Sequence, residues 1–191
     1  VAADDSNKYV TFHELQKQAH SVRAFLVKRG FKEGEVAYLV LSNCIEWAVF
    51  ALGTMAAGGT VSGASAMFTD YELERQFADS NCTIVLTDDG QLPKVQKAIK
   101  NCPTVKSIIC VRRSAQNSPL PTGIFEWEDV ISCKPDYSVA KVDLESIVAL
   151  PYSSGTTGSP KGVMLSHRSV GTMIEIFIEW VVFTTVQMLN S

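Results

Sequence analysis

Hydrophobic and polar residues recur along the chain with two different periods, one typical of helices and one of strands. Residues 11–30 (TFHELQKQAHSVRAFLVKRG) have the helical period. Their apolar residues recur on one helical face: Leu15, Ala19, Val22 and Leu26. Thr11 and Glu14 have the spacing of a capping box, in which each side chain accepts a hydrogen bond from the other residue's backbone N–H. Gly30 suits a left-handed stop, so we expect a helix that begins after Thr11 and ends at Gly30.

Short apolar runs, typical of strands covered on both faces, alternate with further helical segments. The expected strands occupy residues 35–41, 60–65, 83–87, 106–111 and 147–154, and 162–167 also has strand character. The expected helices occupy residues 43–58, 69–80, 92–101 and 125–131. Two of these helices open with the spacing of a capping box, Asn43 with Glu46 and Thr69 with Glu72.

Regular alternation of strands with helices of about 10 to 18 residues predicts the fold class. The class is α/β, with a mostly parallel sheet and helices on both faces. No internal repeat or low-complexity tract interrupts the pattern. A length of 191 residues suits one domain or one lobe of a larger protein.

Charge and cysteine usage narrow the function classes. The net charge is −3, which gives no basic stripe for a nucleic-acid backbone. The five cysteines contain no CxxC pair. They indicate buried, reduced thiols of an intracellular protein, cytoplasmic or peroxisomal, and no metal site.

The two ends of the chain carry no targeting signal that the sequence reveals. The opening residues, VAADDSNKYV, are polar and acidic, unlike a signal peptide. The apolar run IEIFIEWVVFTTV near the end contains Glu175 and Glu179 and is shorter than the roughly 20 residues of a spanning helix. We therefore expect no transmembrane segment.

The most unusual stretch of the sequence is residues 152–162, YSSGTTGSPKG. Its glycines let several backbone N–H groups point into one concavity, which is how anion-binding nests form. Hydroxyl groups add donors, and a lysine adds a mobile positive charge for phosphate oxygens. The residues expected to wrap a polyphosphate are Ser153, Ser154, Gly155, Thr156, Thr157, Gly158 and Lys161.

The spacing within this stretch excludes the two commonest phosphate loops. A Walker A loop needs Ser or Thr directly after its lysine and a helix beyond it. Here Gly162 follows Lys161, and the sequence continues as a strand-like run. The G-x-G-x-x-G spacing of dinucleotide-binding folds is absent from the chain. A kinase or switch protein is therefore poorly supported.

The sequence YSSGTTGSPKGVMLSHRS instead resembles the phosphate-loop signature of the adenylate-forming superfamily, which includes acyl-CoA synthetases, 4-coumarate–CoA ligases and luciferases. The form LPYSSGTTG most resembles the coumarate-ligase and luciferase branch, and the likeness extends over about residues 9–173. The resemblance implies an incomplete amino-terminal subdomain of that fold. It also implies that ATP, Mg²⁺ and coenzyme A act with a small carboxylic acid, through an acyl-adenylate and then a thioester.

By the same resemblance the phosphate contacts are the residues given above, while Pro160 shapes the loop and Gly162 permits its exit. The family's adenine site, acyl pocket and mobile lid lie in segments that do not follow here, and no catalytic or metal-binding residue is carried over to this chain. We expect residues 1–173 to form a partial AMP-binding domain and residues 174–191 a divergent apolar tail. The isolated chain is then expected to be inactive and to expose apolar surface. The alternative is an inactive, truncated fragment that only binds nucleotide phosphates.

Several single residues have an ordinary structural explanation. His167 lies in the family's trailing motif and is expected to be a polar residue bonded to backbone. Trp47 and Trp127 stand at apolar helical positions and are expected in the core. Asp88 with Asp89 is expected to form a turn, and the pair at 112–113 to be solvated arginines.

Overall fold

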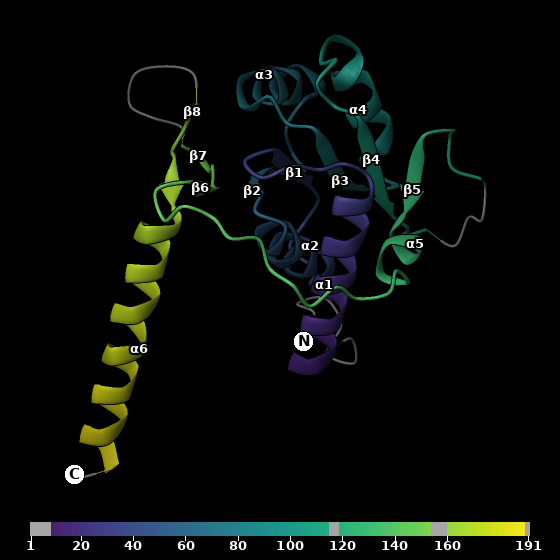
Figure 1. Cartoon of the computed structure of the whole chain (residues 1–191). Helices are drawn as coiled ribbons and strands as arrows, with labels where there is room; N and C mark the ends of the chain where they lie inside the picture. Colours follow the sequence, from purple (N-terminus) through teal and green to yellow (C-terminus); the bar gives the residue numbers. More distant parts are fainter. Residues whose placement is uncertain (1–8, 115–118, 154–159, 190–191) are drawn as a thin grey trace.

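A computed structural model describes residues 9–114, 119–153 and 160–189 of the chain. A sheet of seven strands forms its centre, in the order β5-β4-β3-β1-β2-β6-β9 (Figure 1). Every neighbouring pair is parallel except the last, in which β9 runs antiparallel to β6. The strands are β1 (Val36–Val40), β2 (Thr60–Ala64), β3 (Ile84–Asp88), β4 (Ser107–Val111), β5 (Ile124–Glu126), β6 (Ile147–Ala149) and β9 (Leu165–Ser166). The predicted α/β class is confirmed.

Helices cover both faces of this sheet, as the two-sided apolar strands predicted. The helices are α1 (Phe12–Lys28), α2 (Ile45–Ala56), α3 (Asp70–Ser80), α4 (Leu92–Ala98) with a 3-10 turn (Ile99–Asn101), α5 (Trp127–Ile131) and α6 (His167–Leu189). Figure 1 shows α3 and α4 on one face and α1 and α2 on the other. Successive residues of β1 join the two cores in turn: Ala37 and Leu39 pack toward α1 and α2, and Tyr38 and Val40 toward α3 and α4.

Local sequence signals fix several helix ends. Thr11 with Glu14 and Thr69 with Glu72 form the predicted capping boxes at α1 and α3. Gly30 has a φ of +80°, which confirms the left-handed stop after α1. The predicted capping box at Asn43 is wrong, because α2 begins at Ile45 after an extended Cys44 that makes no side-chain cap.

Three further elements differ from the sequence prediction. Phe125 and Glu126, expected in a helix, belong to β5, which pairs with β4, and α5 starts only at Trp127. The run expected as one strand over 147–154 divides into β6 and β7 (Tyr152–Ser153) on either side of Pro151. The later strand-like run divides into β8 (Lys161–Gly162) and β9. Strands β7 and β8 form a separate two-stranded hairpin.

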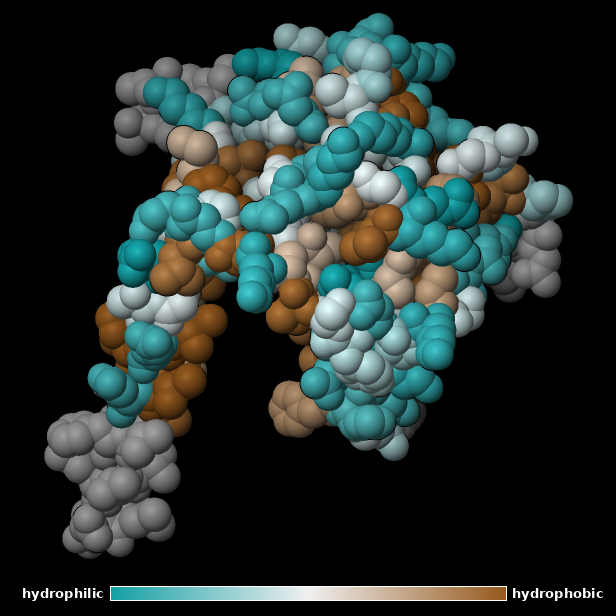
Figure 2. Space-filling model, viewed as in Figure 1, coloured by the Kyte–Doolittle hydropathy of each residue, from teal (hydrophilic) through white to brown (hydrophobic). Residues whose placement is uncertain are grey.

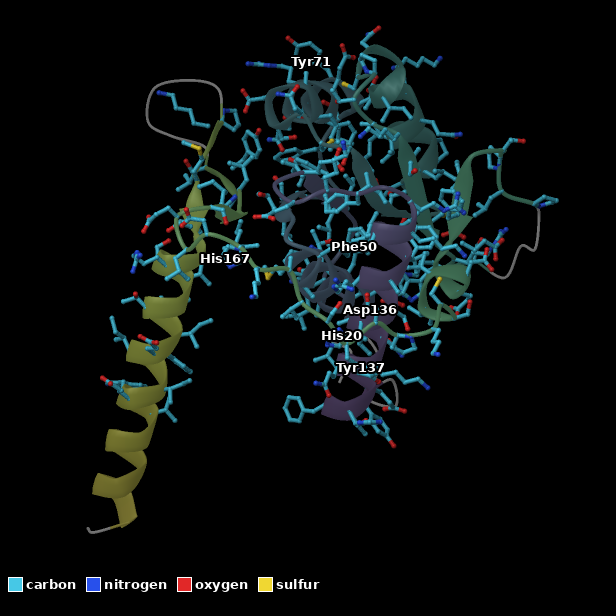
Figure 3. The ribbon with its side chains drawn as sticks, in the orientation of Figure 1. His20, Phe50, Tyr71, Asp136, Tyr137 and His167 are labelled. Atoms are coloured by element: carbon cyan, nitrogen blue, oxygen red, sulfur yellow. The ribbon has the colours of Figure 1, made fainter. Side chains whose placement is uncertain are left out.

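A long connection, residues 132–146, runs from α5, near one edge of the sheet, past α1 to β6, near the other edge (Figure 1). Figure 3 shows His20, Asp136 and Tyr137 gathered where this connection passes α1. His20 Nδ1 lies 2.8 Å from the carbonyl oxygen of Asp136, and its ring centroid is 4.8 Å from that of Tyr137. Arg23 forms an ion pair with Asp136. These contacts hold the connection against α1, and β6 beyond it is held by its pairing with β2 and by the hydrogen bond from the Thr60 hydroxyl to the Ile147 carbonyl at 2.7 Å.

Helix α6 extends away from the sheet and exposes an apolar surface (Figures 1 and 2). Its exposed side chains include Met173, Ile174, Ile176, Phe177, Ile178, Trp180 and Val181. The expected exposure of apolar surface near the end of the sequence is confirmed, although a helix rather than strands carries it. Across the described residues, no helix combines the length and apolarity that a membrane span requires.

Candidate functional site

The β7–β8 hairpin lies just beyond the carboxyl end of β6, at the edge where ligands of parallel α/β sheets are commonly found. Within it, Tyr152 pairs with Gly162, and Ser153 pairs with Lys161. Ser153 and Lys161 are both exposed, so their side chains are open to a ligand. The remaining predicted phosphate contacts (Ser154, Gly155, Thr156, Thr157 and Gly158) lie outside the described residues. The two described contacts thus stand opposite each other at the base of the predicted loop.

The base of the hairpin is fixed to β2 by hydrogen bonds. The Ser62 hydroxyl donates to the Leu150 carbonyl at 2.7 Å, and the Leu150 N–H donates to the Val61 carbonyl at 2.8 Å. The Val163 N–H donates to the Pro151 carbonyl at 2.8 Å, which joins the segment before β7 to the segment after β8 below the stem. The loop is therefore presented from a rigid part of the sheet.

Close packing explains the glycine at the exit of the hairpin. A Cβ atom on Gly162 would lie 3.0 Å from Leu150 Cδ1 and 3.5 Å from Tyr152 Cζ. A side chain at position 162 would have to displace Leu150, so the glycine lets β8 approach β7 closely. This agrees with the role that the sequence suggested for Gly162.

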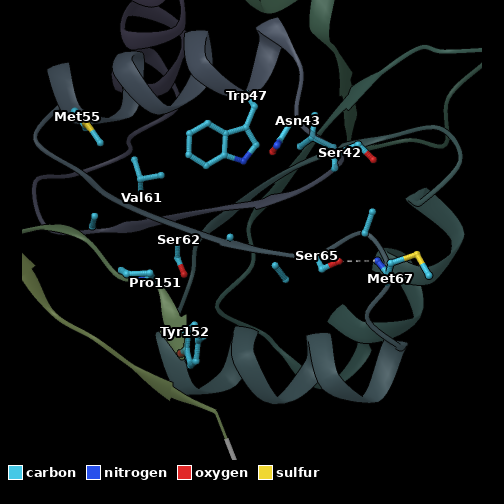
Figure 4. A pocket seen from close by; sticks show the side chains of 15 residues that line it. Ser42, Asn43, Trp47, Met55, Val61, Ser62, Ser65, Met67, Pro151 and Tyr152 are labelled. Atoms are coloured by element: carbon cyan, nitrogen blue, oxygen red, sulfur yellow. Dashed lines mark hydrogen bonds between the residues drawn. The ribbon is translucent and has the colours of Figure 1, made fainter. Parts of the chain in front are cut away.

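A cavity of about 680 Å³ adjoins the hairpin at the carboxyl ends of β1 and β2 (Figure 4). Its walls come from α2 through Trp47 and Met55, from the β2–α3 connection through Met67, and from the hairpin through Tyr152. Trp47 is 36% exposed and lines this cavity, so the prediction that it packs in the core is wrong. Trp127 is buried, as predicted.

Both arginines of the pair after β4 form ion pairs; Arg113 is exposed, as expected, whereas Arg112 is half-buried. Arg113 makes two hydrogen bonds to the Glu46 carboxylate, at 2.9 and 3.1 Å, and Arg112 pairs with Glu126 at 2.6 Å. Burial opposes ionisation of Glu46, but the hydrogen bonds and charge of Arg113 outweigh it and lower the pKa of that carboxyl. Asp89 lies in the predicted turn and accepts from the Ser114 hydroxyl at 2.5 Å. These contacts join the end of β4 to α2, to β5 and to the turn after β3.

His167 is the first residue of α6, and its backbone N–H donates to the Ser146 carbonyl at 3.0 Å. This bond joins two backbone groups, so it does not test the expectation that the His167 side chain bonds to backbone. Its ring Nε2 is buried and has no hydrogen-bond partner among the described residues. The sequence did not indicate this unpaired nitrogen.

Three of the five cysteines are buried and so are poorly accessible as nucleophiles. All five thiols are free; Cys82, Cys102 and Cys110 are buried, and Cys44 and Cys133 are half-buried. Burial raises the pKa of Cys82 to about 12 and that of Cys44 and of Cys110 to about 11. In the described parts of the chain, no group of three or more His, Cys, Asp or Glu residues could hold a metal ion.

A thiol-labelling experiment tests this arrangement. At pH 8 we expect no more than two thiols, Cys44 and Cys133, to react with a disulfide reagent such as DTNB in the folded chain, because the other three are buried. All five should react once the chain is unfolded in guanidinium. Rapid reaction of a third thiol in the folded chain would contradict the packing around Cys82, Cys102 and Cys110.

Comparison with known proteins gives the family. The model of the AMP-binding enzyme family matches residues 1–188. Acyl-CoA synthetase 7 of Caenorhabditis elegans is 38% identical over 180 residues, which cover 92% of this chain and 32% of the nematode protein. 4-Coumarate–CoA ligase 1 of Arabidopsis thaliana is 30% identical over 168 residues, covering 86% of this chain and 29% of the plant enzyme.

Solved structures agree with these matches. The anthranilate CoA ligase AuaEII in complex with anthranoyl-AMP superposes with a TM-score of 0.77 at 25% identity, over 85% of this chain and 30% of that protein. The chain thus spans about a third of the length of the curated relatives it matches. This chain belongs to the AMP-binding enzyme family, and it corresponds to the amino-terminal portion of the adenylate-forming acyl- and aryl-CoA ligases.

Proposed function

We propose that this chain supplies the ATP-phosphate site of an ATP-dependent carboxylate–CoA ligase, which forms an acyl-adenylate and then a thioester. The observation that carries the proposal is the pairing of exposed Ser153 with exposed Lys161 across a short hairpin at the carboxyl edge of the sheet. A hydroxyl donor and an ammonium group, presented side by side from a fixed stem, suit the oxygens of a polyphosphate.

Charge is what the proposed reaction requires of these residues. A carboxylate that attacks the α-phosphate of ATP must approach a second anion, so the phosphate oxygens have to be neutralised and held in place. Lys161 forms no ion pair with any described residue and has its ammonium group available for this purpose. The Ser153 hydroxyl adds a directional donor. We propose that Ser154, Gly155, Thr156, Thr157 and Gly158 complete the cradle.

The proposed Mg²⁺ belongs to the nucleotide rather than to this chain. The described residues contain no cluster of ligands that could hold the ion by themselves, so they do not fit a resident metal site. Mg²⁺ therefore enters as the counter-ion of ATP, and coenzyme A enters as a substrate. Which carboxylic acid is activated depends on the acyl pocket, which by the resemblance given in the sequence analysis lies mostly in other segments of the family fold.

A chimera distinguishes this proposal from the alternative of an inactive phosphate-binding fragment. Residues 9–173 would replace the matched segment of the nematode acyl-CoA synthetase, which is 38% identical over the aligned region. We expect the chimera to catalyse carboxylate-dependent exchange of pyrophosphate into ATP, whereas the 191-residue chain alone should bind ATP without exchange. A chimera that folds by circular dichroism yet shows no exchange would favour the inactive fragment.

A further inference from the structure

The β7–β8 hairpin is too short for its own strand pairing to fix the direction in which it projects. Its stem consists of two strands of two residues each, and it shares no strand pairing with the seven-stranded sheet. Isolated two-stranded hairpins are marginally stable in water. Below the stem, hydrogen bonds from β2 fix Leu150, and the Val163 N–H donates to the Pro151 carbonyl. Another contact is needed to fix the stem itself.

That contact is made by Tyr152, the first residue of β7. Its hydroxyl donates to Asp79 Oδ2, on the last turn of α3, at 2.5 Å. Its ring packs against the core beneath α3 and α4, and the ring carbon Cζ lies beside Gly162 of the opposite strand. Tyr152 therefore contacts both strands of the stem and joins them to a helix 73 residues earlier in the sequence.

The chemistry of the pair favours a lasting hydrogen bond. Burial, together with the hydrogen bond and charge of Asp79, raises the pKa of Tyr152, so the phenol keeps its proton and can donate. An ionised acceptor makes such a bond stronger than one between neutral groups. Gly162 lies against one side of the ring, but a cavity of about 1020 Å³ lined by α3 and Tyr152 adjoins it, so the hydrogen bond to Asp79 restricts the ring more than close packing does.

We propose that Tyr152 and Asp79 are positioning residues that fix the direction in which the hairpin presents Ser153 and Lys161 to phosphate. Tyr152 precedes Ser153 directly, so a shift of its ring moves the first phosphate contact. The inference rests on the proposed function. It adds a second anchor for the hairpin on α3, a helix whose residues are not expected to contact the nucleotide.

The chain offers a matched control for this tyrosine. Tyr38 also donates its hydroxyl to an acceptor on α3, Gln76, which lies one turn before Asp79. Tyr38 is fully buried in β1 and belongs to neither strand of the hairpin, although its hydroxyl lies near Ser62 and Tyr152. Tyr38→Phe and Tyr152→Phe each remove one hydroxyl and one bond to the same helix, but only the second concerns the stem.

The experiment measures the affinity of the 191-residue chain for inorganic triphosphate by calorimetry, together with its melting temperature. We expect Tyr152→Phe and Asp79→Ala each to weaken binding about fivefold, the loss of one charge-assisted hydrogen bond, with the melting temperature nearly unchanged. Asp79→Asn retains an acceptor oxygen and should restore most of the affinity. The double variant Tyr152→Phe/Asp79→Ala should lose no more than either single variant, because both remove the same contact. Tyr38→Phe should lower the melting temperature and leave the affinity unchanged.

Each contrary result has a separate meaning. The proposed function fails if Lys161→Ala has the same affinity for triphosphate as the unsubstituted chain. It also fails if the unsubstituted chain does not bind triphosphate, and in both cases the inference fails with it. If Lys161→Ala weakens binding but Tyr152→Phe does not, the phosphate site stands and the positioning role is wrong. Equal losses in Tyr38→Phe and Tyr152→Phe, or in Asp79→Asn and Asp79→Ala, would also overturn it. Hydrogen exchange gives a readout without ligand: peptides covering the stem should exchange faster in Tyr152→Phe and not in Tyr38→Phe.

Discussion

Replacement of Lys161 by alanine is expected to weaken the binding of ATP and of inorganic triphosphate about tenfold, with the melting temperature unchanged. Lys161 is exposed at the base of the hairpin and pairs through its backbone with Ser153, so its side chain contributes charge rather than packing. A hydrogen bond to a charged group contributes about 1.5–3 kcal/mol, and exposure to solvent places this one at the lower end of the range. Calorimetric titration with both ligands measures the effect.

The matched control for this prediction is Lys100→Ala. Lys100 is an exposed lysine in the turn after α4, and its removal changes the net charge by the same amount. Its affinity for triphosphate should stay within about twofold of that of the unsubstituted chain, because long-range effects of exposed charges are screened by salt. Equal losses in the two variants would mean that only net charge attracts the ligand. No loss in Lys161→Ala would remove Lys161 from the site.

Sequence reasoning succeeded where the determining contacts are local or repeat along one element. The capping boxes at Thr11 and Thr69 need only residues three apart. The apolar run of β1 predicted a strand covered on both faces, and its residues do alternate between two cores. Strands and helices of this kind could therefore be placed from the sequence before any tertiary contact was known.

The wrong predictions concern residues whose structure depends on a partner that is distant in the sequence. Glu46 has the spacing of a capping residue, but its carboxylate binds Arg113, 67 residues away, and α2 begins without a side-chain cap. Phe125 looks helical beside Trp127, yet it pairs with Ile109 of β4 and packs edge-on against Phe25 at 5.3 Å. Neither partner can be read from the neighbouring sequence.

In the candidate site, too, the local features could be predicted from the sequence and the distant contacts could not. Composition and spacing predicted a phosphate loop over residues 152–162, and in the structure two of its predicted contacts, Ser153 and Lys161, lie opposite each other. The anchor on Asp79 was not predicted, because a lone aspartate near the end of a helix has no signal that links it to Tyr152. The position of Trp47 beside a cavity was also missed, since apolar helical spacing does not reveal where the covering layer ends.

Gly53→Ala is expected to destabilise the chain by about 3 kcal/mol, although alanine is the better helix former. Gly53 lies in α2 where this helix crosses α1, and a Cβ atom there would be 2.5 Å from Val22 Cβ and 2.6 Å from the carbonyl oxygen of Ala19. The second contact is with backbone, so relief requires the two helices to separate and opens the core between them.

Gly171→Ala is the matched control, because Gly171 is also helical and a Cβ atom there meets nothing within 4 Å. It should be neutral or stabilise by up to about 1 kcal/mol. Urea unfolding of the two variants should therefore shift the midpoint in opposite directions or leave only Gly53→Ala shifted. A fall in stability of similar size in both would mean that helix–helix packing does not account for the glycine in α2.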